Sequence, residues 1–324
     1  MKKYHAATVR SASLAPALAL LLGSAAGCAT GDEGDPQTRA ALTSVFVYLR
    51  AEAFTKTMPD GRDVVMWGYA QDSAFGAHDG VLSSPGPVIE LQADTTRLTV
   101  QLENNLDVPT SLVIDGLRQS LPAVRHPDGR VRSFTREASP GNVAPVTYVY
   151  SVLRPGTFLY KTGTSPQVQV QMGLLGAVRR PSAAGEAYAG RAFDDELLLV
   201  YSEVDPELHD AVAGGQYGPG LAVTSTIKYV PQYFLVNGED VMSGAYDVDP
   251  SLAGRRLLVR FVNGGLRSHV PLFLQADVLA LAEDGFPYKY PTKRTAVLMP
   301  AGKTADVLFT VPASGAKLLY DRMF

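Results

Sequence analysis

The stretch between residues 147 and 179 places the tightest constraint on how this 324-residue chain can fold. An alternating segment, Thr147–Val152, runs into a Pro155-Gly156 turn, and a second short segment, Thr157–Tyr160, follows the turn. Period-two alternation interrupted by Pro-Gly is typical of two antiparallel strands joined by a turn. We expect the apolar run that comes next, Met172–Arg179, to form a further strand.

The same pattern extends over most of the chain. Short alternating segments are separated by Gly, Pro and Asn, and no segment has the period of a long amphipathic helix. The sequence therefore predicts an all-β fold built from sandwiches or barrels. A small, polar stretch, Pro181–Ala192, indicates a boundary between a first domain (residues 42–182) and a second (residues 193–324).

The two halves resemble each other weakly. Arg97–Asn104 and Arg256–Asn263 are both strand-like and have the same spacing from Arg to Asn. Such a repeat suggests a duplicated sandwich, although two unrelated β-domains could also show it by chance.

The first 28 residues have the pattern of an export signal. Lys2, Lys3 and Arg10 form a basic start, and Leu14–Leu22 is an apolar core too short for a stable membrane anchor. The following Ala25-Ala26-Gly27-Cys28 resembles a bacterial lipobox, which predicts that Cys28 is lipidated. The alternative is an ordinary secretory signal cut near Gly27.

A lipidated Cys28 would attach the protein to the bacterial cell envelope. Residues 29–41 are polar and predict a flexible tether between lipid and domain. Ala29 rather than Asp follows the cysteine, which favours the outer membrane. The domains would then lie in the periplasm or at the cell surface. Cys28 is the only cysteine, so we expect no disulfide in the mature chain.

Charge argues against nucleic acid and anionic lipid as the main partner. The formal net charge is -3, and removal of the signal takes away three positive and no negative charges, leaving -6. An acidic chain without a basic run does not favour nucleic acid as a partner. The sequence also lacks the GxSxG, HExxH and Walker signatures of common enzyme classes.

Histidines offer little support for a metal site. His78 and His126 lie in turn contexts. His209 precedes Asp210 and could be read as a general base with its partner, but adjacent residues seldom orient in that way. His269 is a weak candidate for a lone metal ligand, and a hydrogen-bonded packing histidine is the simpler interpretation.

Several segments together resemble the multicopper oxidase family. The segments that carry the resemblance are Pro85–Ile89, Gly156–Tyr160, Gln171–Gly176, Tyr233–Gly238, Arg260–Leu266 and Pro300–Val307. The resemblance implies two consecutive cupredoxin-like Greek-key β-sandwich domains, equivalent to the first two domains of a three-domain oxidase. In such an oxidase the remaining histidines and the ligand cysteine would belong to the third domain.

The chain departs from the family at the copper ligands of the first domain. Val113 and Asp115 stand where the family has one His-X-His pair, and Lys161 and Gly163 stand where it has another. We therefore expect no copper cofactor. Asp115 and Lys161 either form an ion pair that fills part of the vacated site or remain two solvated side chains.

Three functions stay open. The first is an exported lipoprotein without intact copper sites that binds or scaffolds another envelope or extracellular protein, as a copper-free relative of the family does in bacterial cell division. The alternative is a copper-dependent oxidase, or a subunit of one, whose copper centres are completed by another chain. The third is a small-molecule or glycan binder that uses the loop Gly214–Gly220 with Tyr217 and Tyr229.

Overall fold

The computed structural model describes residues 43–119, 122–240, 245–247, 250–274, 276–313 and 318–322. The predicted signal, the lipobox with Cys28 and most of the tether lie outside these residues. Within the described part of the chain, no helix has both the length and the apolar character needed to cross a membrane.

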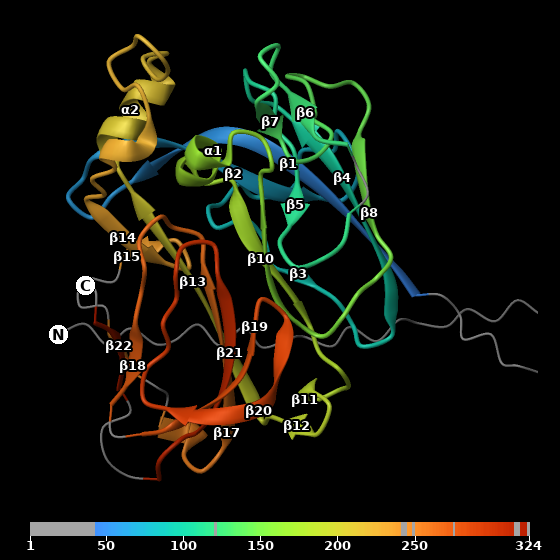
Figure 1. Cartoon of the computed structure of the whole chain (residues 1–324), viewed down its shortest axis with the longest axis vertical. Helices are drawn as coiled ribbons and strands as arrows, with labels where there is room; N and C mark the ends of the chain where they lie inside the picture. Colours follow the sequence, from blue (N-terminus) through green and yellow to red (C-terminus); the bar gives the residue numbers. More distant parts are fainter. Residues whose placement is uncertain are drawn as a thin grey trace, which may run out of the picture.

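Residues 43–180 form two four-stranded sheets (Figure 1). The first contains, in order, β2 (Asp63–Asp72), β1 (Thr43–Thr57), β4 (Thr95–Asn104) and β8 (Val146–Tyr150). The second contains β3 (Ile89–Glu90), β10 (Leu175–Arg180), β9 (Gly156–Lys161) and β5 (Val113–Ile114). A small hairpin, β6 (Val124–Arg125) and β7 (Val131–Ser133), projects from this half.

Residues 195–321 form a seven-stranded and a three-stranded sheet. The larger contains β15 (Glu239–Asp240), β14 (Tyr233–Val236), β13 (Asp195–Val204), β17 (Arg256–Asn263), β21 (Thr304–Thr310), β19 (Val278–Glu283) and β20 (Phe286–Arg294). The smaller contains β16 (Ala245–Asp247), β22 (Leu318–Asp321) and β18 (Pro271–Phe273). The short strands β11 (Glu186–Tyr188) and β12 (Arg191–Ala192) lie in the connection between the halves.

The two halves share a strand arrangement. In the first, β4 is parallel to β1 and antiparallel to β8; in the second, β17 is parallel to β13 and antiparallel to β21. The strands β4 and β17 are the two segments whose sequences echo each other. The repeat seen in the sequence therefore corresponds to a repeat in topology.

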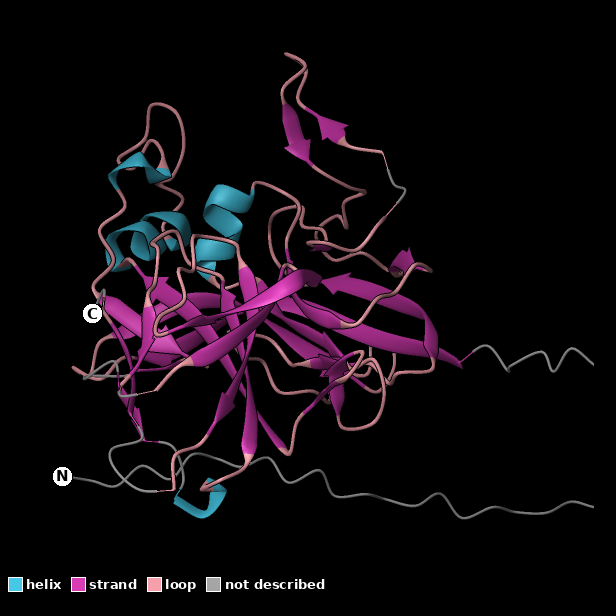
Figure 2. Cartoon of the chain, turned by 60° about the horizontal axis from the view of Figure 1, so that its bottom comes forward, coloured by secondary structure: helices cyan, strands magenta, loops and turns pink. Residues whose placement is uncertain are grey.

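Apolar side chains fill three successive spaces between the sheets. One core lies between the sheets of the first half, and another between the sheets of the second half. A third joins the halves, where Leu159, Leu175 and Ala177 meet Val200 and Val262. The four larger sheets thus stack on one another through these apolar cores, and the prediction of an all-β fold is confirmed (Figure 2).

One predicted strand is wrong at its start. Residues Pro166–Met172 form a helix, α1, and the strand β10 begins only at Leu175. Pro166 lies in the first helical turn, where its missing N–H costs nothing, and Gly173 ends the helix at a φ of 121°. The apolar run is continuous because β10 is buried on both faces, with Val178 in the first core and Ala177 against the second half.

The second helix, α2 (Pro206–Ala213), follows β13 and packs against the first half. Asp205 caps its N-terminus by accepting hydrogen bonds from the backbone N–H groups of Glu207 and Leu208. Leu208 belongs to one apolar cluster with Val168 and Met172 of α1, and the two helices lie together at one end of the sheets (Figure 1). Two 3-10 turns, Thr226–Lys228 and Pro250–Leu252, complete the helical elements described.

Candidate functional site

The four positions at which the resemblance implies copper ligands, Val113, Asp115, Lys161 and Gly163, lie together beside the second sheet. Val113 of β5 pairs with Lys161 of β9, and the backbone N–H of Asp115 donates to Leu159 at 2.9 Å. A Cβ placed on Gly163 would lie 2.9 Å from Val113 Cγ1. Alternate strand residues share a face, so the two residue pairs of the two strands meet at one place.

At this place Lys161 and Asp115 form an ion pair. Lys161 Nζ lies 2.5 Å from Asp115 Oδ2, and the side chains are 21% and 41% exposed. An ion pair that water reaches contributes about 0–1 kcal/mol to stability, because hydration competes with the attraction. The carboxylate therefore neutralises the charge of Lys161, but the ion pair adds little to the stability of the fold.

The side chains present do not fit a copper cluster. Val113 and Gly163 have no donor atom, and the one carboxylate, Asp115, already binds an ammonium group. Imidazoles and thiolates are the protein ligands that copper prefers, and none of the four residues supplies either. In the described ranges, no group of three or more His, Cys, Asp or Glu side chains is placed to hold a metal ion.

A buried hydroxyl network supports the loop that carries Gly163. Ser111 Oγ accepts from the Gly163 N–H at 3.1 Å and from Thr164 Oγ1 at 2.9 Å, and it also contacts Ser133 Oγ at 3.1 Å. All of these hydroxyls are fully or almost fully buried. Sequence reasoning missed this network, because isolated Ser and Thr residues in loops give no signal of burial.

His269 lies in the core of the second half, far from the four positions along the chain. Its Nδ1 is 2.7 Å from Asp321 Oδ2, its Nε2 is 3.1 Å from Glu203 Oε1, and its ring stacks on Tyr201. Burial lowers the pKa of His269, but the hydrogen bonds with Asp321 and Glu203 outweigh burial and raise the pKa to about 9. Both ring nitrogens are held by carboxylates, an arrangement that fits a hydrogen-bonded packing histidine.

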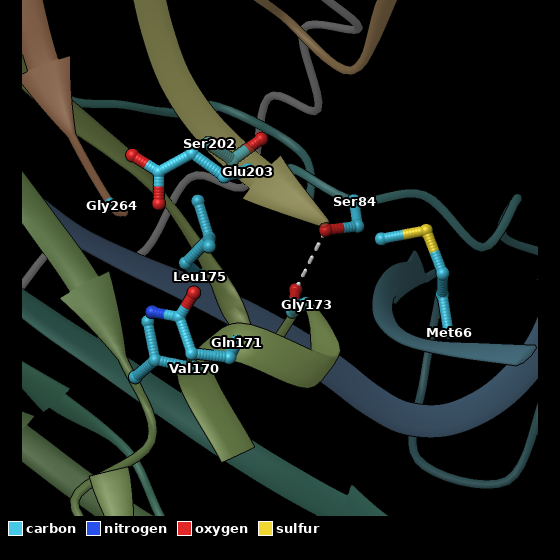
Figure 3. A pocket seen from close by; sticks show the side chains of 9 residues that line it. All are labelled: Met66, Ser84, Val170, Gln171, Gly173, Leu175, Ser202, Glu203 and Gly264. Atoms are coloured by element: carbon cyan, nitrogen blue, oxygen red, sulfur yellow. Dashed lines mark hydrogen bonds between the residues drawn. The ribbon is translucent and has the colours of Figure 1, made fainter. Parts of the chain in front are cut away.

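Glu203 connects this histidine to the junction between the halves. Its carboxylate also accepts from the backbone N–H groups of Leu266 and Arg267 at 2.9 and 3.2 Å. Figure 3 shows Glu203 and Gly264 of the second half facing Leu175 of the first half across a narrow gap. Nearby, Ser84 Oγ donates to Gly173 O at 3.0 Å.

The other histidines have structural partners. His209 is buried, with Nδ1 2.7 Å from Val65 O and Nε2 3.0 Å from Gln171 O, and burial lowers its pKa. Its neighbour Asp210 binds Arg62 at 2.7 Å instead, so the two do not act as a base and its partner. His78 Nε2 lies 2.5 Å from Glu103 Oε1, and His126 occupies a turn.

The aromatic residues of the Gly-rich loop also have packing roles. Tyr217 and Tyr229 contact the apolar cluster of α1 and α2 formed by Val168, Met172 and Leu208. The Tyr229 hydroxyl donates to Glu203 Oε2 at 3.3 Å. These contacts attach the loop to the body of the protein.

A second buried network joins the halves through Arg260. The guanidinium, 1% exposed, donates from Nε to Glu196 Oε2 at 2.9 Å and from Nη1 to Thr157 Oγ1 at 2.9 Å. Asp306 Oδ2 lies 3.5 Å from Nη1 and also accepts from the Tyr188 hydroxyl. Thr157 belongs to β9 of the first half, so this network fixes one half against the other.

Comparison with known sequences supports the resemblance in the first half. Residues 80–180 match the sequence model of a family described as multicopper oxidase. The matched range contains all four of the positions discussed above. The sequence matched none of the curated proteins with which it was compared.

Solved structures extend the likeness to most of the chain. A multicopper oxidase, mgLAC, has a TM-score of 0.66 at 20% identity, covering 87% of this chain and 80% of its own. A blue copper oxidase from Nitrosomonas europaea has a TM-score of 0.64 at 17% identity, covering 86% and 79%. A copper nitrite reductase from the same organism has a TM-score of 0.60 at 19% identity, covering 86% and 89%. At such identities the likeness establishes the fold, and the prediction of cupredoxin-like β-sandwiches is confirmed.

Proposed function

We propose that the chain is an exported, lipid-anchored binding protein without copper redox chemistry; residues 80–180 match the multicopper oxidase model, and the chain shares the fold of such proteins. Its role is to bind or scaffold another protein of the cell envelope. The observation that carries the proposal is the ion pair of Lys161 with Asp115, with Val113 and Gly163 beside it. A lysine ammonium repels a copper ion, and among the four residues only Asp115, its partner, has a side-chain atom that could bind one.

Copper content tests the loss of redox chemistry. Residues 29–324 are loaded with Cu²⁺, dialysed, and analysed for metal bound per chain, with an expected value near zero. The control is the fourfold variant V113H/D115H/K161H/G163H, checked for folding by circular dichroism, which returns imidazoles to the shared face. One or more tightly bound coppers in the unaltered chain would contradict the proposal and favour an oxidase completed by another chain.

Lipidation is tested separately. Cells that express the full chain are fed radiolabelled palmitate, and the label is expected on the protein and lost in Cys28→Ser. Label that persists in Cys28→Ser, or label absent from both, would remove the anchor from the proposal. An ordinary secretory signal would then account for the first 27 residues.

Partner binding needs its own experiment. The full chain in its own envelope is crosslinked and purified, and a protein partner is expected to be recovered in fixed stoichiometry. A chain that stays monomeric and recovers no envelope protein would contradict the scaffold role, whatever its copper content.

A further inference from the structure

A groove lies where the connection between the halves meets the hairpin β19–β20. Its volume is about 490 Å³, which is within the range of small-molecule sites. One wall is the turn before β9, with Arg154 and Pro155; a second is the connection, with Tyr188 and Arg191. The hairpin supplies the third wall, and Figure 1 places β11, β12 and β20 together at this edge of the molecule.

Cations line this groove and carboxylates do not. Arg154, Arg191 and Lys289 are its charged residues. In the part of the chain that the structure describes, no carboxylate forms an ion pair with any of the three. The acidic residues of the hairpin turn, Glu283 and Asp284, both bind Lys303 instead.

Arg154 has hydrogen-bonding capacity that the protein leaves unused. Its Nη2 donates to Gly116 O, but its Nε is buried and has no acceptor. The guanidinium lies over the Phe286 ring, 3.5 Å from the centroid, and 5.8 Å from that of Phe158. Stacking on aromatic rings holds the guanidinium plane in place without neutralising its charge.

The rest of the lining is aromatic and proline-rich. Tyr188 and Tyr288 contribute rings, and Pro155, Pro287 and Pro291 contribute rigid apolar surfaces. The backbones of Gly156 and Gly285 are in close contact at the base of the groove, since a Cβ on Gly156 would lie only 2.7 Å from Gly285 Cα. The groove is therefore a formed feature of the junction between the halves.

We propose that this groove binds a small organic anion that carries an aromatic ring. The anionic group faces Arg154, Arg191 and Lys289, and the ring lies against Tyr188, Tyr288 and the prolines. Arginine is well suited to a carboxylate because its planar fork matches two acceptor oxygens. The site contains none of the four vacated ligand positions, so it is independent of whether the chain binds copper or a protein partner.

Isothermal titration of the full chain with 2-naphthoate tests the site, with neutral 2-naphthamide as the comparison. We expect 2-naphthoate to bind at one per chain with a Kd on the order of micromolar to millimolar, and 2-naphthamide to bind about tenfold more weakly or not at all. Equal affinities for the two probes, or no saturable binding of 2-naphthoate up to millimolar concentrations, would overturn the proposal.

A charge-matched pair of variants places the binding in the groove. R191E/K289E changes two groove cations, and R97E/K228E makes the same change of charge at two exposed residues outside it. The first variant should weaken 2-naphthoate binding about tenfold or more and the second less than about twofold. Equal losses in both variants would show a general charge effect and refute the site. Lys289→Met, at an exposed position, provides a milder groove variant if R191E/K289E does not fold, and it should still weaken binding severalfold.

Discussion

Asn104 and Asn263 make the same three hydrogen bonds at equivalent places in the two halves. Each side-chain amide donates to the carbonyl four residues later, Val108 at 2.9 Å and Arg267 at 2.8 Å. Each also donates to a carbonyl in a distant loop, and each Oδ1 accepts from the backbone N–H two residues later. Both are fully buried at the ends of β4 and β17. The two halves therefore share the hydrogen bonds that hold the loops after β4 and β17, in addition to their strand topology.

The first prediction follows from this relationship. Asn104→Ala or Asn263→Ala removes three hydrogen bonds and leaves buried backbone groups without partners, so each should lower the free energy of unfolding by about 2–4 kcal/mol. Urea unfolding followed by circular dichroism measures the loss. Asn105→Ala, at the exposed neighbouring position, should cost less than about 0.5 kcal/mol. Losses as small in the buried variants as in Asn105→Ala would contradict the shared role.

The second prediction concerns His269 and pH. Its pKa is raised to about 9 by Asp321 and Glu203 against the effect of burial, and an unfolded histidine has a pKa of about 6.5. A raised pKa contributes stability that is fully present below about pH 6.5 and is lost as the pH rises through about 9. The contribution is on the order of 3 kcal/mol.

Urea unfolding from pH 6 to pH 10 tests this. The free energy of unfolding should fall over that range, and His269→Gln should flatten the fall while lowering stability at pH 6. His126→Gln, in a turn, should keep the pH dependence of the unaltered chain. An unchanged slope in His269→Gln would show that His269 is not the titrating group.

The third prediction tests the network that joins the halves. Arg260→Met leaves Asp306 buried without its cation and should lower the free energy of unfolding by about 3–5 kcal/mol. Arg256→Met, on the same strand, breaks an exposed ion pair with Asp194 and should cost less than about 1 kcal/mol. Thermal unfolding of both variants measures the two losses of stability. Similar losses would mean that a buried ion pair stabilises this protein no more than an exposed one.

The fourth prediction tests the close contact of Gly285 with Phe158, which brings the two halves together under the groove. Gly285→Ala would place a Cβ 2.0 Å from Phe158 at a φ of +69°, whereas Gly254→Ala meets nothing within 4 Å at a φ of +77°. Both pay about 1–2 kcal/mol for the left-handed backbone, and Gly285→Ala should cost about 1–3 kcal/mol more through overpacking. Equilibrium unfolding in urea measures the difference, and an equal cost in the two variants would mean that the halves separate easily at this contact.

Local pattern was enough to predict part of the site. Val113 and Asp115 are two residues apart, as are Lys161 and Gly163, and the period of a strand predicts that each pair shares a face. The pairing of Val113 with Lys161 then joins the two faces. The same reasoning failed at Met172, because apolar residues in a short run satisfy a buried helix as well as a buried strand.

The sequence by itself determined the all-β character and the internal repeat, because both depend on residue type and on spacings within one strand or turn. Only the tertiary structure decided which charges are buried together. Arg260 meets Thr157 across 103 residues and His269 meets Glu203 across 66. The groove likewise forms from a turn, a connection and a hairpin of different regions. Such partners are selected by the stacking of the sheets, and no local period in the chain records that stacking.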